Sequence, residues 1–246
     1  MVYRKLIEAD SWKSAARELL LIVAGVMIAL WIGSLHESRV ERHRERATLV
    51  RLLTATRETE QGAIQAVFED SIAGYFQSSL RAAMVGKTTL MPDSLSALIW
   101  RCIWSGGFHP LTGIFNAAAL TGDLNLIRND SLRTAIMSLT GQIEGTVQAI
   151  RLDEAAYNAP VQQGVWITQR LEQGPPPREA AEQWLKSEDL QKAVSGWLLY
   201  FANHRGNILD ILPRLTAMRQ ALEHELDLPS VPAKPPHPII YFEVKK

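Results

Sequence analysis

The sequence predicts an all-α protein in which one N-terminal transmembrane helix continues into a stalk and a helical bundle. The first observation is an uncharged apolar run, Leu19–Leu35. The second is that apolar residues beyond it recur mainly every three or four positions, which is the period of an amphipathic helix. The third is that only Ile239–Val244 resembles a strand, and this segment could add to the edge of a partner's sheet.

These patterns divide the 246-residue chain into five parts. We expect an N-terminal tail over residues 1–18, a transmembrane helix over 19–35, a charged helical stalk over 36–60, a helical bundle domain over 61–228 and a proline-rich tail over 229–246. A chain of this length can bury one good-sized core in addition to an anchor.

The apolar run is long enough to be a membrane anchor. At about 1.5 Å per residue it covers roughly 26 Å, near the lower limit for crossing a hydrocarbon core. Trp12 and Trp31 are spaced to reach the two interfacial layers. Two alternatives are a buried core helix, which rarely stays uncharged over such a length, and a cleaved signal. The Ile32–Glu37 segment is a poor cleavage site because it lacks the A-x-A-like arrangement.

Basic residues flank the run on both sides, so the positive-inside rule gives nearly a tie. They are Arg4, Lys5, Lys13 and Arg17 before the run, and Arg39, Arg42, Arg44, Arg46 and Arg51 after it. Because a short basic tail is costly to translocate and a long domain crosses largely regardless of charge, we expect the N-terminus inside and the domain outside the cytoplasm.

Three small residues, Gly25, Ala29 and Gly33, lie four positions apart on one face of the run. Such a stripe lets two helix backbones approach closely in lipid, so we expect transmembrane helix packing and a homo-oligomer or a membrane-protein partner. The alternative is that these small residues are merely common in membrane helices.

Beyond the anchor the sequence predicts a succession of helices. Residues 36–85 form one long helix, or two joined near Gly62. The next helix follows Pro92, with Asp93 or Ser94 as its N-cap. Further helices are expected at Thr112–Leu120, from Asn129 or Asp130 onward, at Val165–Leu171, at Arg178–Lys186 and at Ser187–Leu226.

Proline marks three breaks in this part of the chain. Gly174–Pro177 must be an extended surface loop. Pro213 should kink the last helix or split it near Leu209. The tail after Leu228 contains too many prolines to continue a helix and is expected to be loose.

Two stretches carry a resemblance to a known family. Arg17-Glu18-Leu-Leu-Leu-Ile-Val-Ala-Gly25-Val-Met-Ile-Ala29-Leu resembles the opening of an uncharacterised bacterial family of N-terminally anchored single-span membrane proteins. The second stretch is similar to that family's Leu-x-x-Gly-x-Leu-x-x-Ile-x-Asn-x-x-Leu motif, at Gly122, Leu124, Ile127, Asn129 and Leu132. Gly33–His36 departs from the family, which usually has Asn and Trp there. The resemblance covers under a third of the chain and implies this architecture in a bacterial membrane, but no chemistry. Combined with the orientation argued from the basic residues, it leads us to expect a single pass of the inner membrane with the domain in the periplasm.

The second stretch also has a physical interpretation. Gly122 permits a left-handed turn, Leu124 and Ile127 enter the core, and Asn129 caps the next helix. We therefore expect a structural helix–turn–helix corner, with a ligand site there as the alternative.

The charge balance and motif content point away from several functions. Lys plus Arg and Asp plus Glu are both 26, so nothing in the net charge attracts nucleic acid. Cys102 is the only cysteine, which excludes an internal disulfide and a zinc site of several thiolates, and we expect it to be buried. Gly86-Lys87-Thr88 lacks the upstream glycine of a phosphate loop, and His36-Glu37 lacks the second histidine of a zinc helix.

We therefore predict no catalytic, cofactor-binding or metal-binding residues. The sequence shows no paired partner for the carboxylates Glu58, Glu60, Asp153 and Glu154, and it predicts a solvated patch at Glu223–Glu225. The expected function is a membrane-anchored helical sensor, binding or scaffold protein, with the lipid bilayer as one partner. The alternatives are a small accessory subunit of a membrane complex and a membrane-anchored enzyme of unfamiliar type.

Overall fold

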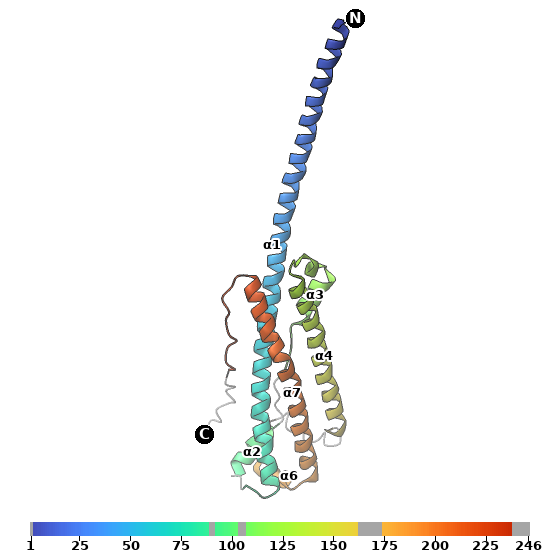
Figure 1. Ribbon diagram of the computed structural model, residues 1–246. Helices are drawn as coiled ribbons and strands as arrows, with labels where there is room; N and C mark the ends of the chain where they lie inside the picture. The colour runs from blue at the N-terminus through green and yellow to red at the C-terminus, as the bar shows by residue number, and fades with distance from the viewer. Residues whose placement is uncertain (1, 89–91, 103–106, 162–173, 238–246) are drawn as a thin grey trace. The chain divides into compact units, whose positions relative to one another are not determined.

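The computed structural model describes residues 2–88, 92–102, 107–161 and 174–237, and every regular element within them is helical. The elements are α1 (Val2–Met84), α2 (Pro92–Arg101), α3 (Thr112–Leu120), the 3₁₀ turn η1 (Asp123–Leu126), α4 (Asp130–Val161), α6 (Arg178–Leu185) and α7 (Glu188–Glu225) (Figure 1). The all-α prediction is confirmed for this part of the chain. The predicted helix at Val165–Leu171 and the strand-like Ile239–Val244 lie outside the described residues.

The chain divides into two compact units, Met1–Thr48 and Leu49–Lys246, and α1 contributes residues to both. In the first unit, the side chains of the apolar run are exposed, as Leu21 is at 74%. Among the described helices, α1 alone is long and apolar enough to cross a membrane, with an 18-residue window of mean hydropathy 2.3. Leu49, Leu52 and Leu53, which fall in the range expected for the stalk, already lie in the core of the second unit.

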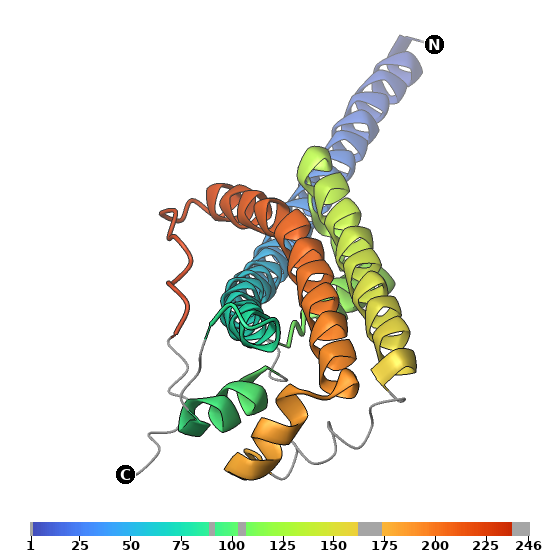
Figure 2. The same cartoon turned by 90° about the horizontal axis from the view of Figure 1, so that it is seen from below.

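The core of the second unit has two apolar clusters. The first cluster joins α1, α3, η1, α4 and the C-terminal half of α7. Its members include Leu49, Leu52, Leu53, Ala63, Ala66, Phe108, Phe115, Leu124, Ile127, Leu132, Ile136, Leu139, Ile143, Ile208, Ile211, Leu215, Met218, Leu222 and Leu226. Figure 2 shows α4 running beside α7 on this side of the bundle.

The second cluster joins the later turns of α1 to α2, α6 and the N-terminal half of α7. It contains Ala73, Leu80, Leu95, Ile99, Cys102, Ala181, Trp184, Leu190, Ala193, Val194, Trp197 and Phe201. The helices α1 and α7 therefore contribute to both clusters, while the shorter helices each cover one of them.

The helix α7 continues through Pro213, so the predicted split near Leu209 is wrong. Ser187 caps its start by accepting a hydrogen bond from the Leu190 amide at 3.2 Å. A proline inside a helix costs about 3 kcal/mol, and burying one large apolar side chain returns roughly 1.5–3 kcal/mol. Ile211 and Leu215, on either side of Pro213, both enter the first cluster, which explains why the helix persists. Figure 2 shows its axis changing direction, as a proline kink would produce.

Two predicted helix starts can be compared with the structure. The helix α2 begins at Pro92, so Asp93 or Ser94 as its N-cap is wrong. Proline is favoured at a first helical position because the missing N–H would be unpaired there in any case. At α4 the prediction is confirmed, because Asn129 Oδ1 accepts from the Leu132 amide at 3.1 Å.

The expected corner between α3 and α4 is also observed. Gly122 has φ of +77°, in the left-handed region, and leads directly into η1. Leu124 and Ile127 are buried in the first cluster. The geometry of this corner is therefore the one that its residues predicted.

Residues 229–237 of the proline-rich tail are held in place by hydrogen bonds, which corrects the expectation that this segment is loose. Residues 229–237 are extended and return alongside α1 (Figure 1). The amides of Lys234 and His237 donate to the side-chain oxygens of Gln61 and Gln65, at 3.0 and 2.9 Å. Prolines exclude a helix here, but they do not prevent an extended chain from bonding to another element.

Candidate functional site

A polar pair occupies the gap between the two apolar clusters. On α1 the first cluster ends at Ala66 and the second begins at Ala73, and Asp70 lies between them. On α7 the second cluster ends at Phe201 and the first begins at Ile208, and His204 lies between them. The helical period that buries the apolar residues therefore also carries both polar side chains inward.

Asp70 and His204 make direct contact. Asp70 Oδ2 lies 2.5 Å from His204 Nδ1, and the side chains are 0% and 3% exposed. The carboxylate engages Nδ1, so Nε2 is the ring nitrogen left to face other groups. Removing both groups from water costs free energy, and apolar side chains could join the two helices without this cost. Buried titratable pairs of this kind are common at functional sites, so we take this layer of the bundle as a candidate site.

A cleft of about 550 Å³ opens beside His204. Its walls come from the loop before α3, the start of α3, the later turns of α4 and the middle of α7. The lining residues are Gly107, Phe108, His109, Pro110, Thr112, Val147, Ile150, Arg151, Glu154, Tyr200 and His204. The cleft thus combines apolar walls with a guanidinium, a carboxylate, a phenol and imidazoles, which is the mixture found in small-molecule sites.

Tyr200 covers the imidazole of His204. The two rings stack with centroids 5.7 Å apart and an interplanar angle of 24°. Burial raises the pKa of Tyr200 to about 12, with the negative charges of Glu154, Asp70 and Asp153 adding to the effect. The phenol therefore remains protonated at neutral pH and can donate a hydrogen bond to a molecule in the cleft.

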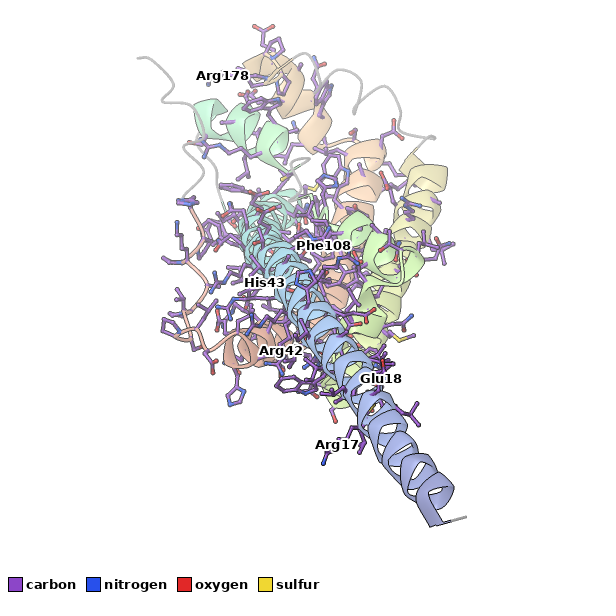
Figure 3. The ribbon with its side chains drawn as sticks, turned by 90° about the horizontal axis from the view of Figure 1, so that it is seen from above. Arg17, Glu18, Arg42, His43, Phe108 and Arg178 are labelled. Carbon is purple, nitrogen blue, oxygen red and sulfur yellow. The ribbon has the colours of Figure 1, made fainter. Side chains whose placement is uncertain are left out.

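The loop that forms one wall is fixed to α1 and to the core. The Leu111 amide donates to Thr59 Oγ1 at 3.2 Å. Phe108 is buried in the first cluster, among the side chains of the bundle (Figure 3). A Cβ on Gly107 would lie 2.6 Å from His109 Nε2, so the absence of a side chain lets that imidazole lie against the backbone.

A smaller hollow of about 350 Å³ lies at Asp70. It is lined by Asp70, Ser71, Gly74, Tyr75, Ser78, Leu198, Phe201, Ala202 and Arg205. The polar pair thus contributes one member to each of two hollows, with His204 in the larger and Asp70 in the smaller.

A second polar cluster ties α1 to the end of α7. Arg219 donates to Glu60 at 2.7 Å and to Glu223 at 2.9 Å, and Arg57 donates to Glu223 at 2.9 Å. Thr216 adds a hydrogen bond to Glu60 at 2.6 Å. The prediction of a solvated patch at Glu223 is wrong, because its side chain is 1% exposed, and Glu60 has the partner that the sequence did not reveal.

The charges of this cluster stabilise one another. Burial alone would raise the pKa of the Glu223 carboxyl, but hydrogen bonds from Arg57, Ser230 and Arg219 outweigh it and lower the pKa. Burial likewise acts to lower the pKa of Arg219, and its bonds to Glu60 and Glu223 reverse this. Because its buried charges pair with one another, we assign this cluster to stability.

The residues singled out from sequence lie elsewhere. Gly25, Ala29 and Gly33 are exposed on the first unit, and a Cβ on Gly25 or Gly33 would meet nothing within 4 Å. Glu18 is exposed beside Arg17, and both side chains project from α1 (Figure 3). None of these residues lines the cleft.

Cys102 is buried as predicted, and its burial raises the pKa of the thiol, so it is not a reactive group. Within the described part of the chain, no three His, Cys, Asp or Glu side chains are placed to hold a metal ion.

The fold and site define an all-α bundle with a polar cleft, in a chain whose N-terminal helix has the length and composition of a membrane span. The chain matches no protein-family model, no curated protein and no solved structure. Its function must therefore be argued from the site itself.

The sequence analysis missed both members of the polar pair, although one signal could have identified them. Asp70 and His204 lie at core positions of their helices, three or four residues from Ala66, Ala73, Phe201 and Ile208. A titratable residue at a core position needs a buried partner, so each of these positions predicts one. The sequence could not show that the two residues are each other's partner.

Proposed function

We propose that this chain is a single-span protein of a bacterial inner membrane whose periplasmic helical domain binds a small polar molecule, and so acts as a sensor. The observation that carries the binding function is the buried Asp70–His204 pair in the wall of the cleft. The anchor assigned to it is Leu19–Leu35.

The support for the anchor is the exposure of its side chains. Leu20, Leu21 and Trp31 are each more than 60% exposed, and every residue between Leu19 and Leu35 is exposed. An uninterrupted apolar surface of this size is unfavourable in water, so it is expected to be buried against lipid or against another protein. The length of the apolar run matches the hydrocarbon core of a bilayer, which favours lipid.

The support for binding is the chemistry of the cleft. Arg151 and Glu154 on α4 offer opposite charges, and Tyr200 offers a hydroxyl that stays protonated. His204 is held by Asp70 in one orientation, which reduces the entropy lost when a ligand bonds to it. A molecule with both hydrogen-bond acceptors and donors suits this set of groups.

A ligand screen with the full-length protein in detergent micelles tests the binding function. We expect at least one compound from a panel of small polar metabolites to raise the melting temperature. Arg151→Gln and Glu154→Gln should reduce that shift, because both residues line the cleft. Arg214→Gln, an exposed change on α7 outside the cleft, should keep it. Equal shifts in the cleft variants and the control, or no stabilising compound, would contradict the proposal.

The same pair favours an enzyme as the second candidate. A carboxylate that orients an imidazole is the arrangement of a general base, and His204 lines the cleft. Turnover of a stabilising compound by the wild-type protein, lost in His204→Gln with binding retained, would establish this candidate over the sensor.

A further inference from the structure

The extended tail lies on a specific face of α1. Gln61 and Gln65 are one helical turn apart on that face. Gln61 accepts from the Lys234 amide, and Gln65 accepts from the His237 amide. Gln65 Nε2 also donates to the His237 carbonyl at 3.2 Å, so one side chain pairs with both backbone groups of a single residue.

This pairing recognises backbone groups of the tail. A glutamine amide that bonds to the N–H and the C=O of one residue recognises the backbone of an extended chain. It makes no contact that depends on the side chain of the bound residue. Prolines at 229, 232, 235 and 236 keep the segment extended before it binds, which lowers the entropy cost of binding. The site therefore suits proline-rich extended peptides as a class.

The start of the tail contacts the buried ionic cluster. Arg219 lies 3.4 Å from Ser230 Oγ, and the Ser230 hydroxyl contributes to the lowered pKa of Glu223. The tail thus covers charges at one end and pairs with glutamines at the other. Two independent contacts along one segment make a binding site for that segment.

The tail follows a hydrogen-bonded turn at the end of α7, in which the Asp227 amide donates to the His224 carbonyl and the Leu228 amide to the Glu223 carbonyl. Asp227 has φ of +55°, and it is the only described residue other than glycine with a positive φ. Tail residues Val231 and Lys234 remain exposed, and the hydrogen bonds of Lys234 and His237 are at the surface. A segment held by a few surface hydrogen bonds can leave its site locally and be replaced by the identical segment of another copy.

We propose that the Gln61/Gln65 face of α1 is a binding site for an extended proline-rich peptide, and that the residue 229–237 segment of a second copy can occupy it in place of the chain's own. The known fit of this segment argues for the second copy as occupant, because both copies carry the same site and the same tail. The inference is independent of the cleft and of its ligand.

The test uses full-length chains in detergent micelles and a fluorescent peptide with the sequence of residues 229–237. In Lys234→Pro/His237→Pro, the chain's own tail stays extended but loses both N–H donors, so the site is vacated. The peptide should bind this variant at least about tenfold more tightly than wild type, whose own tail competes at a high effective concentration. Adding Gln61→Ala/Gln65→Ala should abolish the binding.

Ala233→Pro is the matched control, because it adds a proline to the same segment at a position whose amide makes no hydrogen bond within the described residues. It should behave as wild type. If the peptide fails to bind the vacated chain, or binds the Gln61→Ala/Gln65→Ala chain equally well, the site does not exist.

A mixing experiment then identifies the occupant. One chain carries Lys234→Pro/His237→Pro, so its binding site is intact and its tail is defective. The other carries Gln61→Ala/Gln65→Ala, so its tail is intact and its binding site is defective. Energy transfer between labelled chains should rise only in the mixture, above the level of each variant alone. If the peptide binds but the mixture shows no rise, exchange between copies is overturned and the site serves a segment of a different protein.

Discussion

Asp70 on α1 and His204 on α7 are separated by 134 positions in sequence and meet at 2.5 Å in the interior of the bundle. They lie at the level where one apolar cluster stops and the other starts. Because only one relative register of α1 and α7 brings the two groups together, the pair specifies that register as well as a wall of the cleft.

Replacing Asp70 tests the energetic role of the pair. Asp70→Ala leaves the buried imidazole without its partner, so we expect a loss of about 1–3 kcal/mol in the free energy of unfolding. Asp70→Asn should lose less, because its amide oxygen can still accept from Nδ1. Urea unfolding followed by tryptophan fluorescence measures both. Equal losses for Asn and Ala would show that the hydrogen bond contributes nothing.

Arg219 should be more important for stability than any exposed arginine. Arg219→Ala leaves Glu60 without its arginine partner while buried and removes one partner of Glu223, so the expected loss is about 3–5 kcal/mol. The control is Arg178→Ala, which breaks an exposed pair with Glu182 and should cost less than about 1 kcal/mol. Similar losses for the two variants in thermal or urea unfolding would contradict the assignment.

Glu223 predicts an acid-dependent loss of stability. Its folded-state pKa is lowered below the ordinary 4.5, so the unfolded chain takes up the proton more readily than the folded one. The stabilisation is present above pH 4.5 and is lost as the pH falls through the folded-state pKa. Glu223→Gln should therefore flatten the stability curve below pH 4.5, whereas Glu58→Gln, an exposed change on α1, should not. Parallel curves for wild type and Glu223→Gln would refute this.

The anchor and its small-residue face can be tested in cells. We expect the full-length chain in the membrane fraction, released by detergent and not by high salt. Gly25→Ile with Gly33→Ile should reduce chemical crosslinking between copies, because it closes the face on which two backbones approach. Leu21→Ile with Leu30→Ile is the matched control within the same run. An unchanged crosslink yield would discard self-association through this face.

The sequence by itself determined the elements of this protein. The period of apolar residues specified the all-α class, and local chemistry specified the corner at Gly122 and the cap at Asn129. The uncharged run at Leu19–Leu35 indicated the candidate span directly. All of these depend on residues within a few positions of one another, which is the range over which a helix or turn is decided.

Only the tertiary structure decided which polar groups meet. Asp70 and His204, Glu60 and Arg219, and Gln65 and His237 are each separated by more than 130 positions. The sequence places each on its own helix or tail, but the pairing depends on how α1 and α7 pack. Local sequence patterns do not encode that packing. A polar residue on the buried face of a helix shows that a buried partner is needed, but the pattern does not show which residue of another element supplies it. For the same reason the sequence suggests that Glu223 is solvated and that the tail is loose. In the structure Glu223 is buried beside Arg219, and hydrogen bonds to Gln61 and Gln65 hold residues 229–237 against α1.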